Sequence, residues 1–160
     1  MNPNIFDRVK AFFIKPDQTK SGLLYFNALL QLGKDASPID EADDVLGCVD
    51  SVEEIYKRTF GTYIQNPKTL STRRLYLTLL DRPDKFQKID VPVRGAIIIS
   101  PTGYSTKGAQ NGHVGICSDW DVVMSNDSRS GLWLENYTSR SWKQYYRDKL
   151  GFPVHFFLVK

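Results

Sequence analysis

Cysteine and histidine, which can act together as nucleophile and base, each occur only twice in this chain. The cysteines are Cys48 and Cys117, and the histidines are His113 and His155. Cys48 stands in GCVDSVEEIYKR (47–58), where the apolar spacing predicts that it lies in the first turn of a helix. Unpaired N–H groups and the dipole of a helix N-terminus stabilise a thiolate. Cys48 is therefore a candidate nucleophile, with a buried structural cysteine as the alternative.

A nucleophilic cysteine needs a base within hydrogen-bond reach. His113 begins the predicted strand HVGIC (113–117) after a loop rich in Gly, Ser and Asn, a setting in which catalytic groups are common. The alternative for His113 is a surface histidine in a turn. His155, in VHFFLV, is more simply a strand residue on an edge or a partly solvated face. Cys117 lies four residues beyond His113, about 13 Å at the rise of a strand, and is predicted to be core.

HVGIC and DVVMSN (121–126) are expected to form a β-hairpin. A symmetric turn around Asp119 and Trp120 places His113 opposite Asn126, on the same face of the sheet. The Asn126 amide oxygen then accepts from one imidazole nitrogen and directs the other nitrogen towards Cys48. A bulge would shift this orienting role to Ser125 or Asp127.

Helical periodicity comes first along the chain and strand periodicity follows, which predicts one α+β domain. Residues 81–92 are expected to be a polar connection. The predicted helices cover 5–13, 23–32, 47–60, 73–80 and 139–150. The predicted strands are 94–100, 113–117, 121–126, 132–137 and 154–159.

GCVDSVEEIYKRTFG, PVRGAIIIS, GHVGIC and VVMSN together resemble the papain-like cell-wall hydrolases of the CHAP and NlpC-type families. The resemblance implies a papain-like fold in which the nucleophile helix packs on a C-terminal antiparallel sheet. It implies one domain, 1–160, with a helical part at 1–40 and a catalytic core at 45–160. In this comparison Cys48 is the nucleophile, His113 the base and Asn126 the orienting residue. Gly47 replaces the Asp usual in the NlpC-type pattern, which favours a CHAP-like or divergent member.

The activity implied by the resemblance is hydrolysis of a peptidoglycan peptide amide through a thioester acyl-enzyme, as in a phage lysin, a tail enzyme or an antibacterial effector. A deamidase or acyltransferase acting on another substrate, or an inactive binding module, are the alternatives. Asp50 is a candidate for binding a substrate ammonium group, with a solvated or capping carboxylate as the other reading. Four aromatic residues are candidates for lining the groove or for the core: Tyr104, Trp120, Trp133 and Tyr137.

Composition and charge limit the classes of partner that are expected for this chain. The net charge is +3 and the basic residues are spread along the chain, so no nucleic-acid partner is expected. The spacing of the cysteines and histidines predicts no metal site, and no cofactor is expected. The N-terminus lacks the features of a signal peptide, and no apolar stretch predicts a membrane span. We expect synthesis in the cytoplasm and action at the cell wall after release, injection or assembly into a phage particle, with an immunity or phage structural protein as a further partner class.

Overall fold

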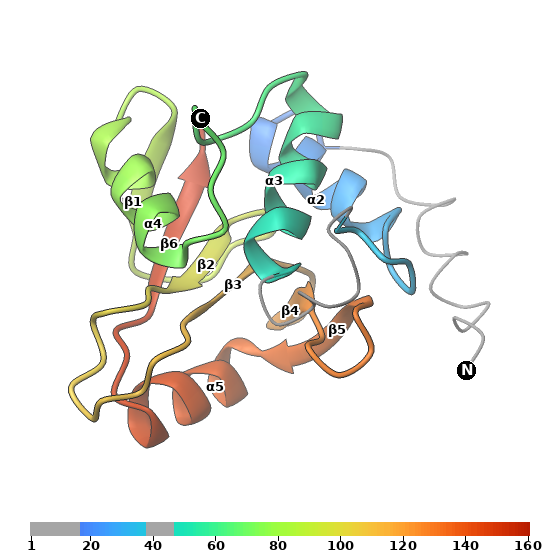
Figure 1. Ribbon diagram of the computed structural model, residues 1–160. Helices are drawn as coiled ribbons and strands as arrows, with labels where there is room; N and C mark the ends of the chain where they lie inside the picture. The colour runs from blue at the N-terminus through green and yellow to red at the C-terminus, as the bar shows by residue number, and fades with distance from the viewer. Residues whose placement is uncertain (1–16, 38–46) are drawn as a thin grey trace.

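The computed structural model describes residues 17–37 and 47–160 of the chain. The helix expected at 5–13 lies outside these residues. The described part is an α+β structure with four α-helices and a six-stranded antiparallel sheet (Figure 1). No helix in this part is long and apolar enough to cross a membrane. The α+β class expected from the order of periodicities is thus confirmed.

The sheet has the strand order β1-β6-β2-β3-β4-β5. Its strands are β1 (Phe86–Ile89), β2 (Ile97–Ser100), β3 (His113–Cys117), β4 (Val122–Asn126), β5 (Trp133–Thr138) and β6 (His155–Val159). Strand β1 lies in the stretch expected to be a polar connection. The sequence does not indicate a strand there because the two central side chains of β1 are exposed and only Phe86 is fully buried. His155 lies in β6, which is an inner strand and not an edge.

Helices cover both faces of the sheet. The first face carries α2 (Lys20–Leu29), α3 (Gly47–Phe60) and α4 (Thr72–Asp81), whose apolar side chains share one core with Val114 and Ile116. The opposite face carries α5 (Ser139–Trp142) and the π-helix η2 (Lys143–Lys149) that continues it. In Figure 1 these last two form the single helix labelled α5. Thr138, rather than Ser139 or Ser141, caps α5.

The apolar pattern of α3 explains its position. Val49, Val52, Ile55 and Tyr56 recur at helical spacing, and all four are buried against the sheet and the neighbouring helices. The helix ends before Gly61, whose φ of 77° is the left-handed conformation that favours glycine at this position. The packing of α3 on β3 and β4 places the first turn of the helix near the start of β3.

The β3–β4 hairpin differs from the expected one in the length of its loop. Its loop has three residues, Asp119 to Asp121, closed by a 2.7 Å bond from the Ser118 N–H to the Val122 carbonyl. The observed pairs are Gly115 with Ser125, Ile116 with Met124 and Cys117 with Val123. The extra loop residue shifts the register by one position, so the expected pairing of His113 with Asn126 is wrong. Since side chains alternate between faces, Ser125 shares the face of His113 and Asn126 lies on the other.

Candidate active site

Cys48 lies in the first turn of α3, where its side chain is only 5% exposed. Burial in apolar surroundings raises the pKa of the thiol to about 11, although hydrogen bonds from the backbone of Val114, Val49 and Cys48 itself act in the opposite direction. Burial thus outweighs the stabilisation of a thiolate that is expected at the helix N-terminus, and the overall shift of the pKa is upward. The resting group is a neutral thiol at neutral pH.

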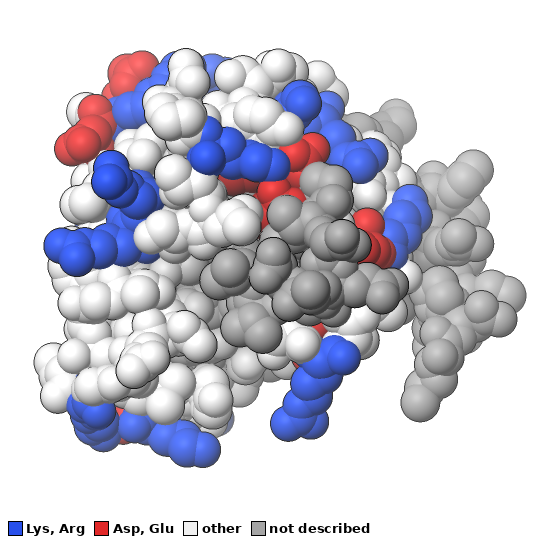
Figure 2. Space-filling model, in the orientation of Figure 1, with Lys and Arg blue, Asp and Glu red and all other residues white. Residues whose placement is uncertain are grey.

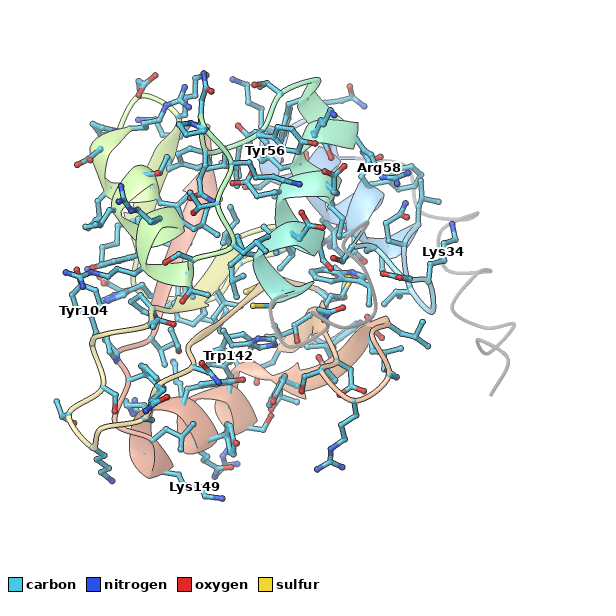
Figure 3. The ribbon with its side chains drawn as sticks, in the orientation of Figure 1. Lys34, Tyr56, Arg58, Tyr104, Trp142 and Lys149 are labelled. Carbon is cyan, nitrogen blue, oxygen red and sulfur yellow. The ribbon has the colours of Figure 1, made fainter. Side chains whose placement is uncertain are left out.

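His113 is the first residue of β3, and its ring packs on aromatic residues of the opposite layer. The ring is stacked on Trp142 at 5.1 Å between centroids and on Tyr146 at 5.6 Å. Trp142 lies between its helix and the sheet (Figure 3). Burial lowers the pKa of His113 to about 4, and the charge of Asp127 opposes this shift. The imidazole is therefore neutral at neutral pH and is available as a base.

A hydrogen-bond chain fixes the tautomer of this neutral ring. His113 Nε2 lies 3.0 Å from Ser125 Oγ, and the Ser125 hydroxyl donates to Asn136 Oδ1 at 2.7 Å. Because the Ser125 hydroxyl has one hydrogen and gives it to Asn136, its oxygen accepts the hydrogen of His113 Nε2. The other ring nitrogen, Nδ1, then carries the lone pair that a general base requires.

Asn136 reaches Ser125 because of a β-bulge. Val123 pairs with Tyr137, but the next residue, Met124, pairs with Glu135, so Asn136 is an extra residue in β5. Bulges re-aim side chains and are common beside active sites. Ser125 is one of the two alternatives that a shifted register predicts for the orienting residue, whereas Asn136 is not indicated by the sequence, since no pattern of residue types marks a bulge of this kind.

Two adjoining cavities meet at Cys48. The first, of about 360 Å³, is lined by Cys48, Leu70, Ser71, Thr72, Thr102, Asn111 and Gly112. The second, of about 190 Å³, shares Cys48, Asn111 and Gly112 with the first. It is further lined by His113, Asn126, Asp127, Ser128, Asn136, Tyr137, Tyr145, Tyr146 and Leu150. The predicted nucleophile and base therefore come from opposite layers of the molecule and line the same cavity.

Asn126 approaches Cys48 from the α3 side of the sheet. Its side chain is 2% exposed, and its Nδ2 would lie 2.8 Å from a Cβ atom added to Gly47. Any larger residue at 47 would thus displace the amide. Gly47, the residue before the nucleophile, permits the close approach of Asn126 to the first turn of α3. Asn126 belongs to the site, but in a position different from that of a residue orienting His113.

Asp50 is placed inside the protein instead of in the cavities. Its carboxylate is fully buried, and it contacts Lys68 Nζ at 2.5 Å and Ser37 Oγ at 2.8 Å. Lys68 also bonds Glu54 at 3.1 Å. Asp50 therefore neither faces a cavity that could hold a substrate ammonium group nor lies in solvent. It is paired with the ammonium group of Lys68. This ion pair joins α3 to the segment that carries Leu70 and Ser71 in the wall of the first cavity.

The candidate groove aromatics are distributed differently from the expectation. Trp133 is fully buried in the core, and Trp120 is 95% exposed at the far end of the β3–β4 hairpin from His113. Tyr104 packs edge-on against Tyr76 at 5.5 Å and does not line either cavity (Figure 3). Tyr137 does line the second cavity.

Tyr145 and Tyr146 also line the second cavity. The sequence does not indicate this, because a helical pattern alone does not show which face of the helix meets the cavity.

Cys117 is buried in the core of the opposite face, as predicted, and burial raises its pKa to about 12. Both cysteines are free. The described residues contain no group of three or more His, Cys, Asp or Glu side chains that could hold a metal ion.

Comparison of the chain with family models, with curated proteins and with solved structures finds no match.

Proposed function

We propose that this protein is a cysteine-dependent amide hydrolase of papain-like architecture that cleaves peptides of peptidoglycan. The observation that carries the proposal is the meeting of Cys48 and His113 at one cavity, with the tautomer of His113 set by Ser125 and Asn136. Cys48 is the nucleophile and His113 the base in this proposal. Ser125 and Asn136 are positioning residues, which replaces the role first expected for Asn126.

The reaction starts from a neutral pair, because burial disfavours both the thiolate and the imidazolium. His113 Nδ1 takes the thiol proton as Cys48 Sγ attacks the amide carbonyl. The tetrahedral intermediate collapses to a thioester when the same proton passes to the leaving amine. Water then attacks the thioester and gives a proton to Nδ1. Release of the acid returns that proton to the sulfur.

Asn126 has a role in this mechanism as a donor to the oxyanion. The backbone N–H of Cys48 lies at the N-terminus of α3, and the Asn126 side chain lies beside Gly47 and lines the same cavity. Donors of this kind stabilise the negative charge of a tetrahedral intermediate. We assign Asn126 Nδ2 to this role, together with the N–H of Cys48.

The peptidoglycan substrate rests on the sequence resemblance, and the shape of the site is compatible with it. Cavities on both sides of Cys48 offer space for the two halves of an extended peptide. The charges of the described residues agree with a peptide partner. On the face that Figure 2 shows, their Lys and Arg side chains lie in separate groups rather than in one continuous stripe.

The test is incubation of purified peptidoglycan with the protein and mass analysis of the released fragments. We expect fragments with a new amine and a new carboxylate, and a trapped acyl group on Cys48 after rapid acid quenching. Cys48→Ala should release nothing. Cys117→Ala is the matched control, since it removes the other buried cysteine and should stay active. Equal release by the wild type and Cys48→Ala would exclude the mechanism, provided that both proteins show the same circular dichroism spectrum.

A further inference from the structure

The two cavities beside Cys48 differ in charge. Apart from Cys48, the described residues that line the first cavity carry no ionisable side chain: they are Leu70, small hydroxyl residues, Asn111 and Gly112. The described lining of the second cavity contains the Asp127 carboxylate and three tyrosines, and no Lys or Arg is among these residues. Among the described lining residues, a substrate that crosses Cys48 therefore passes from uncharged side chains to a carboxylate.

The position of His113 decides which half of the substrate enters which cavity. Its proton must pass to the leaving amine, so the ring must lie on the side of the leaving group. His113 lines the second cavity and not the first. It follows, if the proposed function is correct, that the acyl half lies in the first cavity and the amine half in the second.

Asp127 is held in place by its own loop. Its Oδ2 accepts from the Ser130 backbone N–H at 3.1 Å and from the Ser130 hydroxyl at 2.8 Å. The carboxylate is thus fixed at the end of β4, and its charge acts on the ring of His113 across the cavity. A fixed carboxylate is a favourable partner for a cation that enters this space.

The tyrosine rings add to the attraction for a cation. An ammonium or guanidinium group within about 6 Å of an aromatic ring centroid is stabilised by the ring. Tyr145 already makes such a contact, because Lys149 Nζ lies 5.3 Å from the centre of its ring. Tyr137 and Tyr146 complete the aromatic wall of the second cavity.

We propose that the second cavity is a cation subsite, so that the residue on the amine side of the scissile bond carries an ammonium or guanidinium group while the residue on the acyl side is uncharged. Asp127 is the specificity-determining residue, and the tyrosines form the aromatic wall beside it. This inference rests on the proposed function for the direction of the substrate. The affinity of the cavity for a cation does not depend on catalysis.

Binding is tested first, on the Cys48→Ala protein, with the Nα-acetyl amides of lysine, norleucine and glutamate. NMR titration should give a Kd for the lysine derivative at least about tenfold below that of norleucine, with the weakest binding for glutamate. Asp127→Asn, which keeps an oxygen for Ser130, should bring the lysine and norleucine values together. Asp90→Asn is the control, since Asp90 is exposed and lines neither cavity. Equal Kd values for lysine and norleucine would overturn the inference.

Catalysis is tested next, on the peptide identified in the peptidoglycan digest, synthesised with lysine, norleucine or glutamate after the scissile bond. We expect kcat/KM to fall in that order, by at least about tenfold at the first step, and the ratio to collapse in Asp127→Asn but not in Asp90→Asn. Equal kcat/KM for all three peptides would overturn the inference and leave the proposed function standing. Failure of the wild type to cleave peptidoglycan would refute the function, while the titration would still decide the cation subsite.

Discussion

The two faces of the sheet contribute different halves of the candidate active site. The α3 face provides Cys48 and Asn126, and the opposite face provides His113 and Ser125. These groups meet only at the start of β3, beyond the last observed pair of the β3–β4 ladder, Gly115 with Ser125. Because side chains alternate along a strand, the candidate catalytic side chains are divided between the two faces of the sheet. A strand end is where side chains from both layers can reach one space.

The two faces also surround their reactive groups in different ways. Cys48 is enclosed by aliphatic side chains and backbone N–H groups, whereas His113 is enclosed by aromatic rings and a hydroxyl. Both environments disfavour charge, so in the proposed mechanism proton transfer and attack on the substrate occur together. The predictions below alter one face at a time.

The largest effect is expected when the base is removed from the opposite face. His113→Ala should lower kcat/KM for the identified peptide by at least about 10³-fold, because the group proposed to take the thiol proton and pass it to the leaving amine is lost. Steady-state kinetics measure the loss. His155→Ala is the control, since His155 stacks on Tyr76 away from both cavities. A loss of the same size in the control would show that the effect is structural.

Removal of the amide on the α3 face should have the next largest effect. Asn126→Ala should lower kcat by about 10²-fold through the loss of one oxyanion donor. Alkylation of Cys48 by iodoacetamide at pH 9 forms no oxyanion, so its rate should not change. The two rates are compared on the same protein samples. If alkylation slows as much as hydrolysis, Asn126 acts by shaping the site and not by binding the oxyanion.

A smaller effect is expected from the hydroxyl that orients the base. Ser125→Ala removes the acceptor of His113 Nε2, so kcat/KM should fall by about tenfold. The acid limb of the pH profile should also move to lower pH, because an acceptor that stabilises the imidazolium is lost. Ser125→Thr keeps the hydroxyl and should restore both properties. An unshifted acid limb in Ser125→Ala would count against a positioning role.

Stability should depend on the partly buried histidines of both faces. The pKa values of His113 and His155 are lowered by burial from 6.5 to about 4. Between pH 6.5 and pH 4 the unfolded chain therefore binds more protons, and the free energy of unfolding falls as the pH falls through this window. His155→Phe keeps a ring against Tyr76 and should reduce proton uptake on unfolding near pH 5 by about one. Urea unfolding at several pH values measures this uptake, and an unchanged uptake would contradict the prediction.

The smallest effect is expected from the β3–β4 loop, which sets the register of these two strands. Trp120 has a φ of 55° and is 95% exposed, so it is in a left-handed conformation without burying its ring. Trp120→Gly should raise the free energy of unfolding by about 1 kcal/mol, because glycine adopts this conformation without the steric cost. Leu80→Gly, in an exposed position of α4, should be destabilising instead. Destabilisation by Trp120→Gly would mean that the indole makes stabilising contacts.

Much of the fold could be predicted because its periodicity is strong. The expected helices at 47–60 and 73–80 correspond to α3 and α4, and the five expected strands correspond to β2 to β6. Strand β1 could not be recognised, since an edge strand of four residues with exposed polar side chains has no clear alternation. That Cys48 and His113 line one cavity could be anticipated from a predicted helix start and a predicted strand start.

The orienting residues could not be settled from the sequence, because one loop residue decides the face on which they lie. The sequence CSDWDVV (117–123) is compatible with both a two-residue and a three-residue loop. Only the longer loop places Ser125 beside His113. Asp119 favours the observed loop through tertiary contacts. Its carboxylate accepts from Tyr25 Oη at 2.5 Å and pairs with Arg94 Nε at 2.7 Å. Contacts from so distant a residue as Tyr25 are invisible to local pattern analysis.

The position of β6 has a consequence for the order in which the molecule can be completed during synthesis. Strand β6 joins β1 to the rest of the sheet, and Val159 exchanges hydrogen bonds with the hydroxyl of Ser21. The ribosome therefore finishes Cys48 and His113 well before the strand that connects β1 to β2 exists. A nascent chain that ends before residue 155 holds both reactive side chains, but β1 has no strand to pair with. The sheet is thus complete only after its last strand in chain order has been translated.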